Sequence, residues 1–340
     1  MGRNNNFDAL RFWAALAVLW GHSFPLGANQ PDPLDALTHG QTSIGGIAVA
    51  IFFVISGYLI TGSYRNSPRP LRFMKSRALR IFPGLIAVLL LTAFVVGPLI
   101  TTLPLREYFL DPLTYKFAYH SLPIFKGNFD ELPGVFLTSN TPKSVNGSLW
   151  TLNYEFRCYL LVLLFGMVGL LNRVVMSIGL TLLLALIVFM DHSNFLFSNS
   201  VILTAYFFAG SILFLIGITP NRFLVAACLI AIIASLIVGA RFPVVMTLAG
   251  SYIVICIGIS NAIRIPYLSR FGDLSYGTYI YAFTVQQIVA LTFASNSTWL
   301  INAAVSTPIV VGLAALSWRY VEKPALDLKS NRLLPYGGSE

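Results

Sequence analysis

Long apolar runs, separated by short polar segments, recur along the whole chain. A helix that crosses the hydrocarbon core of a bilayer needs about 20 predominantly apolar residues. Runs of that length at so many positions predict an all-α polytopic integral membrane protein. Ten spans are expected, roughly at residues 7–26, 44–63, 80–102, 148–170, 174–190, 200–217, 223–240, 243–261, 275–294 and 300–318.

The composition agrees with this class, since 56% of the 340 residues are hydrophobic and only 10% are charged. Such values exclude an ordinary soluble globular protein. The net charge of +9 does not indicate a nucleic-acid partner, because the basic residues lie between apolar runs. The three cysteines (Cys158, Cys228 and Cys256) lie inside apolar runs, without the spacing of a disulfide framework or a metal site. We expect no metal.

The basic residues of the short loops predict the orientation of the chain. With the amino terminus in the cytoplasm, nearly all of them fall on the cytoplasmic side, which places both termini there. The densest cluster is the cytoplasmic segment Tyr64–Arg80, whereas the long segment 103–147 lies outside. The first run contains ionisable residues and nine further spans follow, so a retained helix is favoured over a signal peptide. We expect a membrane domain at 1–325 and a short cytoplasmic tail at 326–340.

The first apolar run carries Arg11 and His22, eleven residues apart. At about 100° per residue both side chains project from one face of a helix, separated by roughly 16 Å along its axis. Ionisable groups at membrane depth are costly and usually face a protein interior or a wet cavity. A general base (His22) beside an arginine that binds an anion is the functional interpretation. The alternatives are an arginine that reaches lipid phosphates and a histidine that merely packs.

Arg77 and Arg80 are three residues apart at the cytoplasmic mouth of the third span. Guanidinium groups bind phosphate oxygens in a bidentate manner, so this pair suits a phosphorylated ligand. Topology signalling and contact with anionic lipids explain the pair at least as well on physical grounds alone.

Two further segments place polar groups in apolar helices. In the second span, Ser56 and Gly57 allow either a cavity or close helix packing. At the outer entry of the fourth span, Trp150 suits the membrane interface, and Glu155 lies deep enough to reach a chamber and to pair with His22. A structural ion network is the alternative for Glu155.

A late helix carries Tyr279 and Gln286, which are seven residues apart and share a face. They are candidates for the lining of a polar chamber, although tyrosines are also common at membrane interfaces. The remaining histidines fall in the outer loops, where surface positions are the simpler interpretation: His39, His120 and His192.

These short motifs occur together and in order over nearly the whole chain, and in this the chain resembles the acyltransferase-3 family of integral membrane acyltransferases. The matching residues are Arg11-x10-His22, Phe52-Phe53-x-x-Ser56-Gly57-Tyr58-Leu59-Ile60, Arg77-x-x-Arg80 before Pro83, Ser148-Leu149-Trp150-Thr151-Leu152 with Glu155, Leu274-Ser275-Tyr276-Gly277, and Trp318-Arg319-Tyr320-Val321-Glu322-Lys323-Pro324.

The resemblance implies ten membrane helices with both termini in the cytoplasm of a bacterium, in its inner membrane. It implies transfer of an acyl group, usually acetyl, from cytoplasmic acetyl-CoA to a sugar hydroxyl of lipopolysaccharide O-antigen, exopolysaccharide or another glycan. It points to Arg11 and His22 as essential, and to Arg77 and Arg80 as contributors. Many members carry a further soluble domain after the last helix, whereas this chain resembles a stand-alone member.

The implied reaction suits the expected layout. Acyl-CoA would bind from the cytoplasm through Arg77 and Arg80, with Arg11 further along the channel. His22 would act as general base, oriented by Glu155, or would carry the acyl group transiently. A transporter or flippase of a glycolipid or organic anion is the main alternative, but the inverted repeats or paired broken helices typical of transporters are not evident. A membrane scaffold would leave the cost of an intramembrane arginine and histidine unexplained.

Overall fold

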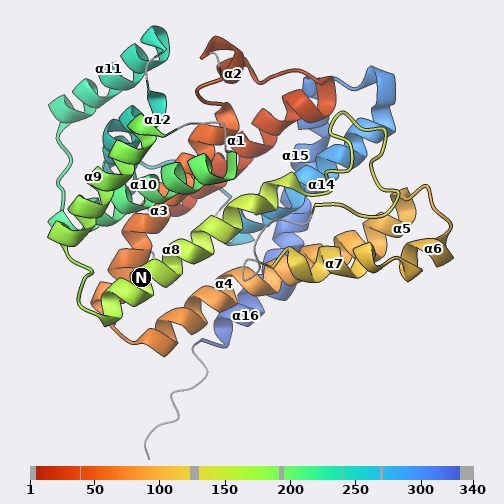
Figure 1. Cartoon of the computed structure of the whole chain (residues 1–340), viewed down its shortest axis with the longest axis horizontal. Helices are drawn as coiled ribbons and strands as arrows, with labels where there is room; N and C mark the ends of the chain where they lie inside the picture. Colours follow the sequence, from red (N-terminus) through yellow and green to blue (C-terminus); the bar gives the residue numbers. More distant parts are fainter. Residues whose placement is uncertain are drawn as a thin grey trace, which may run out of the picture.

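The computed structural model describes residues 5–38, 40–122, 130–190, 195–239, 241–268 and 271–329, and every regular element within them is a helix (Figure 1). The predicted all-α class is therefore confirmed. The elements are α1 (Phe7–Ala28), α2 (Pro33–Leu37), α3 (Ile44–Asn66), α4 (Pro70–Leu91), η1 (Thr92–Val96), α5 (Gly97–Ile100), α6 (Leu105–Leu110), α7 (Pro112–His120), η2 (Gly147–Leu149), α8 (Trp150–Met167), α9 (Arg173–Phe189), α10 (Phe195–Ile216), α11 (Arg222–Val238), α12 (Phe242–Val245), η3 (Met246–Gly250), α13 (Ser251–Ile259), α14 (Ser275–Phe293), η5 (Ala294–Asn296), α15 (Trp299–Ser317), η6 (Trp318–Glu322) and α16 (Lys323–Asp327).

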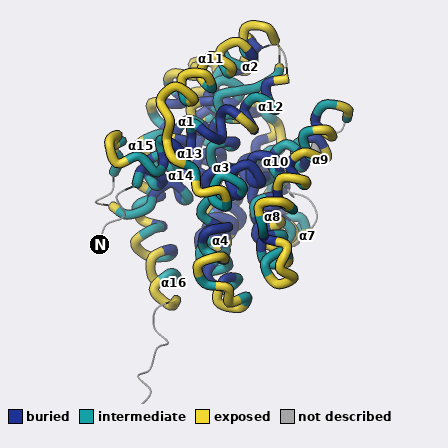
Figure 2. The backbone as a smooth tube through the Cα atoms, turned by 90° about the vertical axis from the view of Figure 1, so that its left-hand side faces the viewer, coloured by how far each residue is buried: buried dark blue, intermediate teal, exposed yellow. Residues whose placement is uncertain are grey.

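Each of the ten predicted apolar runs lies on a helix or on consecutive helical segments. Five of the described helices are long and apolar enough to cross a membrane: Ile44–Asn66, Pro70–Ile100, Phe197–Ile216, Phe242–Ile259 and Trp299–Asp327. Much of α9 and α11 is exposed (Figure 2), and the exposed large apolar side chains include Leu182 of α9 and Ile230 and Ile233 of α11. Apolar surface of this extent is typical of contact with lipid.

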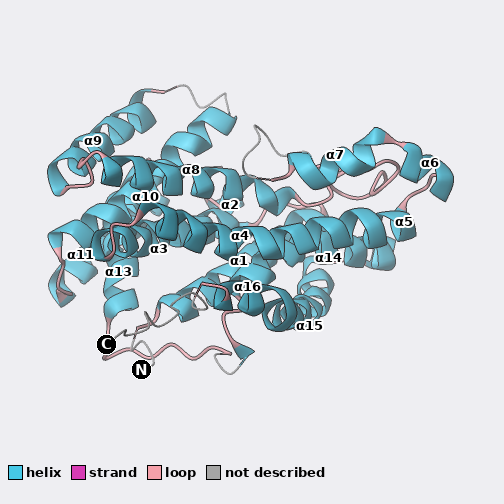
Figure 3. Cartoon of the chain, turned by 90° about the horizontal axis from the view of Figure 1, so that it is seen from below, coloured by secondary structure: helices cyan, strands magenta, loops and turns pink. Residues whose placement is uncertain are grey.

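Two segments expected to be loops contain helices. The basic segment Tyr64–Arg80 is mostly helical, because α3 continues to Asn66 and α4 already begins at Pro70. Proline suits the first position of a helix, since its ring presets φ and no N–H partner is needed there. Arg77 and Arg80 therefore stand on α4. The segment 103–147, which was expected to lie outside the membrane, contains α6 and α7, and α7 runs back beside α4 and η1 (Figures 1 and 3).

The centre of the molecule is formed by α1, α3 and α14, with α10 against α3 and α15 against α1 and α14. Buried residues concentrate in these helices, while the ends and the outer helices are exposed (Figure 2). Asn6 anchors the start of α1, because its side-chain amide donates to the carbonyl oxygens of Ile257 (2.9 Å) and Ile263 (2.7 Å). The helix that carries Arg11 and His22 therefore packs against α3, α14 and α15, while Trp13 and Trp20 on its outer side are exposed.

The end of the segment 103–147 is hydrogen-bonded to α14 just before α8 begins. Asn146 donates to the carbonyl oxygen of Ile280 (2.8 Å), Thr284 to that of Val145 (2.9 Å), and Gln287 to that of Ser144 (2.7 Å). These bonds fix the point at which the chain enters α8, and with it the positions of Trp150 and Glu155.

Gly57 of α3 lies in the tightest part of the contact with α10. A Cβ atom on Gly57 would collide with the carbonyl group of Phe207, and one on Gly210 of α10 with that of Val54. Close packing is therefore the reason for Gly57, as one of the two sequence interpretations held.

We expect Gly57→Ala to destabilise the protein, because the added Cβ meets backbone that cannot move aside cheaply; overpacking of this kind costs about 1–3 kcal/mol. The matched control is Gly312→Ala on α15, where a Cβ meets nothing within 4 Å. Thermal unfolding in detergent, followed by size-exclusion chromatography, measures the difference. Equal melting temperatures for the two variants would contradict the packing.

Candidate active site

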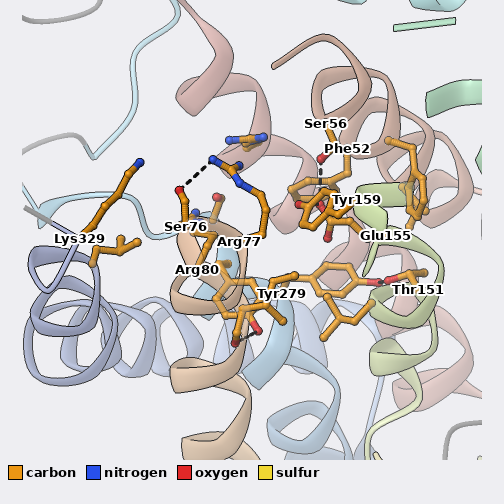
Figure 4. A pocket seen from close by; sticks show the side chains of 18 residues that line it. Phe52, Ser56, Ser76, Arg77, Arg80, Thr151, Glu155, Tyr159, Tyr279 and Lys329 are labelled. Atoms are coloured by element: carbon orange, nitrogen blue, oxygen red, sulfur yellow. Dashed lines mark hydrogen bonds between the residues drawn. The ribbon is translucent and has the colours of Figure 1, made fainter. Parts of the chain in front are cut away.

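A cavity of about 200 Å³ lies between α1, α3, α4, α8 and α14, and Leu326 of α16 and Lys329 also line it (Figure 4). Its polar lining comprises Arg11, Ser56, Ser76, Arg77, Arg80, Thr151, Glu155, Tyr159, Ser275, Tyr276, Tyr279 and Lys329. We call this the arginine cavity. Three residues expected to bind a phosphorylated ligand, on two helices far apart in sequence, thus meet in one space.

Arg80 is already neutralised by acidic side chains. One guanidinium nitrogen lies 2.5 Å from Asp273 and another lies 3.9 Å from Glu322, which in turn accepts a hydrogen bond from Ser317 (2.9 Å). Burial works against ionisation of Asp273, but Arg80 and then Arg11 hold its pKa below the ordinary value. Arg80 therefore joins α4 to the start of α14 and the end of η6.

Arg77 has no such partner. Its guanidinium donates to the hydroxyl oxygen of Ser76 (3.2 Å), its Nε is buried without a hydrogen-bond partner, and it forms no ion pair within the part of the chain that the structure describes. A guanidinium in this state retains the capacity to bind an anion. The two arginines, which the sequence treats alike, thus differ in their surroundings.

Glu155 faces the same cavity and is held by two hydroxyl groups. Ser56 donates to its Oε1 at 2.8 Å, and Tyr159, one turn along α8, donates to the same oxygen at 2.5 Å (Figure 4). The expected pairing of Glu155 with His22 is therefore corrected: Glu155 belongs to the arginine cavity, whereas His22 lines a different one. Spacing along α8 does not determine the rotation of the helix about its axis, and this rotation turns Glu155 toward Ser56 and Tyr159.

His22 lines a second cavity, of about 500 Å³, between α1, α2, the start of α3 and α10. We call this the histidine cavity. The Nδ1 atom of His22 is buried without a hydrogen-bond partner among the described residues, and the ring packs edge-on against Phe283, with 5.5 Å between centroids. Trp150 lines this cavity too. Arg11 and His22 stand on one helix, as predicted, but open into different spaces.

Asp32 is a residue of this site that the sequence analysis missed. It is 5% exposed, its Oδ1 accepts the N–H groups of Leu34 (2.9 Å) and Asp35 (2.8 Å), and its Oδ2 accepts that of Ile44 (2.7 Å). It lines the histidine cavity together with Asp35. A carboxylate there stabilises positive charge on an imidazole. The Asp32-Pro33 pair signals a helix start, but nothing local signals that the chain folds back to His22.

Tyr279 and Val49 line both cavities and therefore form part of the wall between them. The Tyr279 hydroxyl group is 2.6 Å from that of Thr151 and donates to the carbonyl oxygen of Ser148 (2.9 Å). Tyr279 therefore lines the polar cavities, which is the first of the two interpretations that its sequence position allowed.

Gln286 does not share this placement. It is fully buried, and its amide donates to the carbonyl oxygen of Leu19 (2.7 Å) and to the hydroxyl of Ser23 (2.8 Å), while Asn302 lies 3.1 Å away. It is not part of the lining of either cavity. Gln286 therefore joins α1, α14 and α15, and its expected place in the chamber is corrected.

The other candidate groups lie elsewhere. His120 ends α7, whereas His39 and His192 fall outside the described residues. No group of three or more His, Cys, Asp or Glu side chains that could hold a metal ion occurs in the described ranges.

Comparison with known proteins gives a consistent result. Residues 4–319 match the sequence model of the acyltransferase-3 family, described as an acyltransferase domain. A protein of Shigella phage Sf6 named O-acetyl transferase is 33% identical over 355 residues, covering 98% of this chain and 99% of that protein. Nodulation protein 10 of Rhizobium leguminosarum bv. viciae is 29% identical over 363 residues, covering 97% of this chain and 95% of that protein. No solved structure matches the chain.

Proposed function

The chain belongs to the acyltransferase-3 family and is an O-acyltransferase, and we propose that it moves an acetyl group from cytoplasmic acetyl-CoA to a hydroxyl group of a surface or secreted glycan. The observation that carries this proposal is the pair of cavities that share Tyr279 and Val49. A donor held on one side and an acceptor held on the other would meet at this wall.

The arginine cavity is the proposed donor site. Acetyl-CoA carries phosphates at one end and a thioester at the other, and Arg77 with Arg11 supplies guanidinium groups for the phosphates. Arg80, bound by Asp273 and Glu322, holds α4 in place and contributes less directly. Glu155, fixed by Ser56 and Tyr159, faces the arm that bears the thioester.

The histidine cavity is the proposed acceptor site. The sugar hydroxyl oxygen attacks the thioester carbonyl carbon as His22 accepts the hydroxyl proton. An ester C–O bond forms, the C–S bond breaks, and the departing CoA thiolate receives that proton from His22. Asp32 and Asp35 stabilise the imidazolium that forms. Transient transfer of the acetyl group to His22 is the variant of this scheme.

The proposed topology has ten membrane spans, both termini in the cytoplasm, and a bacterial inner membrane as location. Arg77 and Arg80 line the arginine cavity and belong to the basic segment that begins at Arg65, so the donor cavity would open to the cytoplasm. The transporter alternative is disfavoured, because the family and the relative named O-acetyl transferase are catalysts of acyl transfer.

Mass spectrometry of the cell's surface glycans, with and without the gene, tests the proposal. We expect the mass increment of one acetyl group per repeat unit to be lost without the gene and restored by the wild-type chain. Loss of a mass that corresponds to a different acyl group would support O-acyl transfer to the glycan, but with a donor other than acetyl-CoA. Unchanged glycan mass, with glycan missing from the surface, would instead support a transporter.

A further inference from the structure

The two cavities differ in the sign of their charged groups. The arginine cavity is lined by three arginines and a lysine against the single carboxylate of Glu155. In the histidine cavity the charged lining residues within the described ranges are Asp32 and Asp35, and no Lys or Arg is among them. The acceptor side of the proposed site is therefore acidic.

Among the described residues, no lysine or arginine forms an ion pair with these carboxylates. Asp32 is bound by three backbone N–H groups, which leave its negative charge in place, and neither aspartate forms an ion pair within the described part of the chain. The nearest basic residue to consider is Arg241, because the backbone N–H of the next residue, Phe242, donates to the side chain of Gln41 in the lining (3.3 Å). Arg241 itself is exposed and does not line the cavity.

The rest of the lining is neutral and suited to a sugar. Gln41, Thr42 and Asn199 provide amide and hydroxyl groups, while Trp150 and Tyr206 provide aromatic rings. Hydroxyl-rich ligands are bound by such polar groups, and the apolar faces of sugar rings pack on aromatic side chains. The volume of about 500 Å³ is within the range of small-molecule sites.

We propose, building on the function proposed above, that the histidine cavity accepts a neutral, hydroxyl-rich sugar and rejects acidic sugars such as uronic acids. A carboxylate brought into this cavity would face Asp32 and Asp35, and like charges at short range repel each other. The same charges repel the phosphates of acyl-CoA, which keeps the donor on its own side of Tyr279 and Val49.

The charge of the cavity can be measured without any acyl transfer. Gly45 lines the cavity, and a Cβ there meets only the hydroxyl of Ser43 at 3.8 Å, so Gly45→Cys introduces a thiol with little strain. A cationic methanethiosulfonate (the trimethylammonium-ethyl reagent) and an anionic one (the sulfonatoethyl reagent) are reacted with this thiol. The rate with the cationic reagent is divided by the rate with the anionic reagent, and this ratio is divided by the same ratio for a small free thiol in solution. Labelling of the wild-type chain is subtracted to remove the contribution of its native cysteines.

We expect the corrected ratio to favour the cationic reagent about tenfold, and Asp35→Asn to reduce it several-fold. Glu107→Gln, which removes an exposed carboxylate of α6 outside the lining, is the matched control and should leave the ratio unchanged. A corrected ratio of one, or one that favours the anionic reagent, would overturn the proposal.

Selectivity is tested with octyl β-glucoside and octyl β-glucuronide, a matched neutral and anionic pair, at submicellar concentration with acetyl-CoA. We expect kcat/KM for the neutral acceptor to exceed that for the anionic acceptor at least tenfold. Asp35→Asn should reduce this ratio of the two kcat/KM values. Equal or reversed preference would overturn this inference while supporting acyl transfer to sugars. If neither is acetylated, the sugar acceptor of the proposed function is contradicted, and the thiol labelling still decides the charge of the cavity.

Discussion

His22→Ala is expected to abolish acetyl transfer to the glycan while the protein remains folded in the membrane. Loss of a general base typically lowers the rate by 10²–10⁴-fold. The Nδ1 atom of His22 has no hydrogen-bond partner among the described residues, and the ring lines the cavity next to Tyr279, so His22 is the proton acceptor of the proposed reaction. Acetyl transfer by purified protein, measured as release of free CoA in the presence of acceptor, gives the rate.

His22→Gln keeps a polar side chain of similar size and should be equally inactive, since it cannot accept the proton. Unaltered melting temperatures of both variants would exclude unfolding as the cause. Incubation with radiolabelled acetyl-CoA without acceptor separates the two chemical schemes, because only the relay leaves label on His22. Substantial activity in His22→Ala would remove this residue from the mechanism.

Arg77→Ala is expected to raise the KM for acetyl-CoA by about 10–100-fold with a smaller change in kcat. A hydrogen bond to a charged group contributes about 1.5–3 kcal/mol, which corresponds to this range. Arg77 forms no ion pair within the described residues, so its removal should leave the fold intact. Initial rates over a range of acetyl-CoA concentrations provide both parameters.

Arg72→Ala is the matched control, because Arg72 is an exposed arginine of the same helix outside the arginine cavity. It should leave the KM unchanged. Arg80→Ala should differ from both variants. It leaves the carboxylates of Asp273 and the buried Glu322 without their positive partner, and we therefore expect a lower melting temperature. An unchanged KM in Arg77→Ala would contradict the assignment of the arginine cavity to the donor.

Local sequence patterns predicted the helices, because a bilayer demands continuous apolar segments with satisfied backbone hydrogen bonds. They also placed Arg11 and His22 on one helix and Arg77 and Arg80 one turn apart, since helical geometry depends only on spacing along the chain. They failed where a helix extended beyond its apolar run, as α4 does from Pro70, because basic residues are good helix formers as well as loop residues.

The sequence by itself thus determined the class of the protein, its helical segments and most of the residues at its centre. Only the tertiary structure decided which of them meet: that Glu155 binds Ser56 and Tyr159, that Asp273 and Glu322 neutralise Arg80, that Gln286 is structural, and that Asp32 borders the cavity of His22. Spacing along a helix shows which residues share a face, but not which other helix that face contacts. The rotation of each helix and its packing partners depend on segments that lie far away in the sequence.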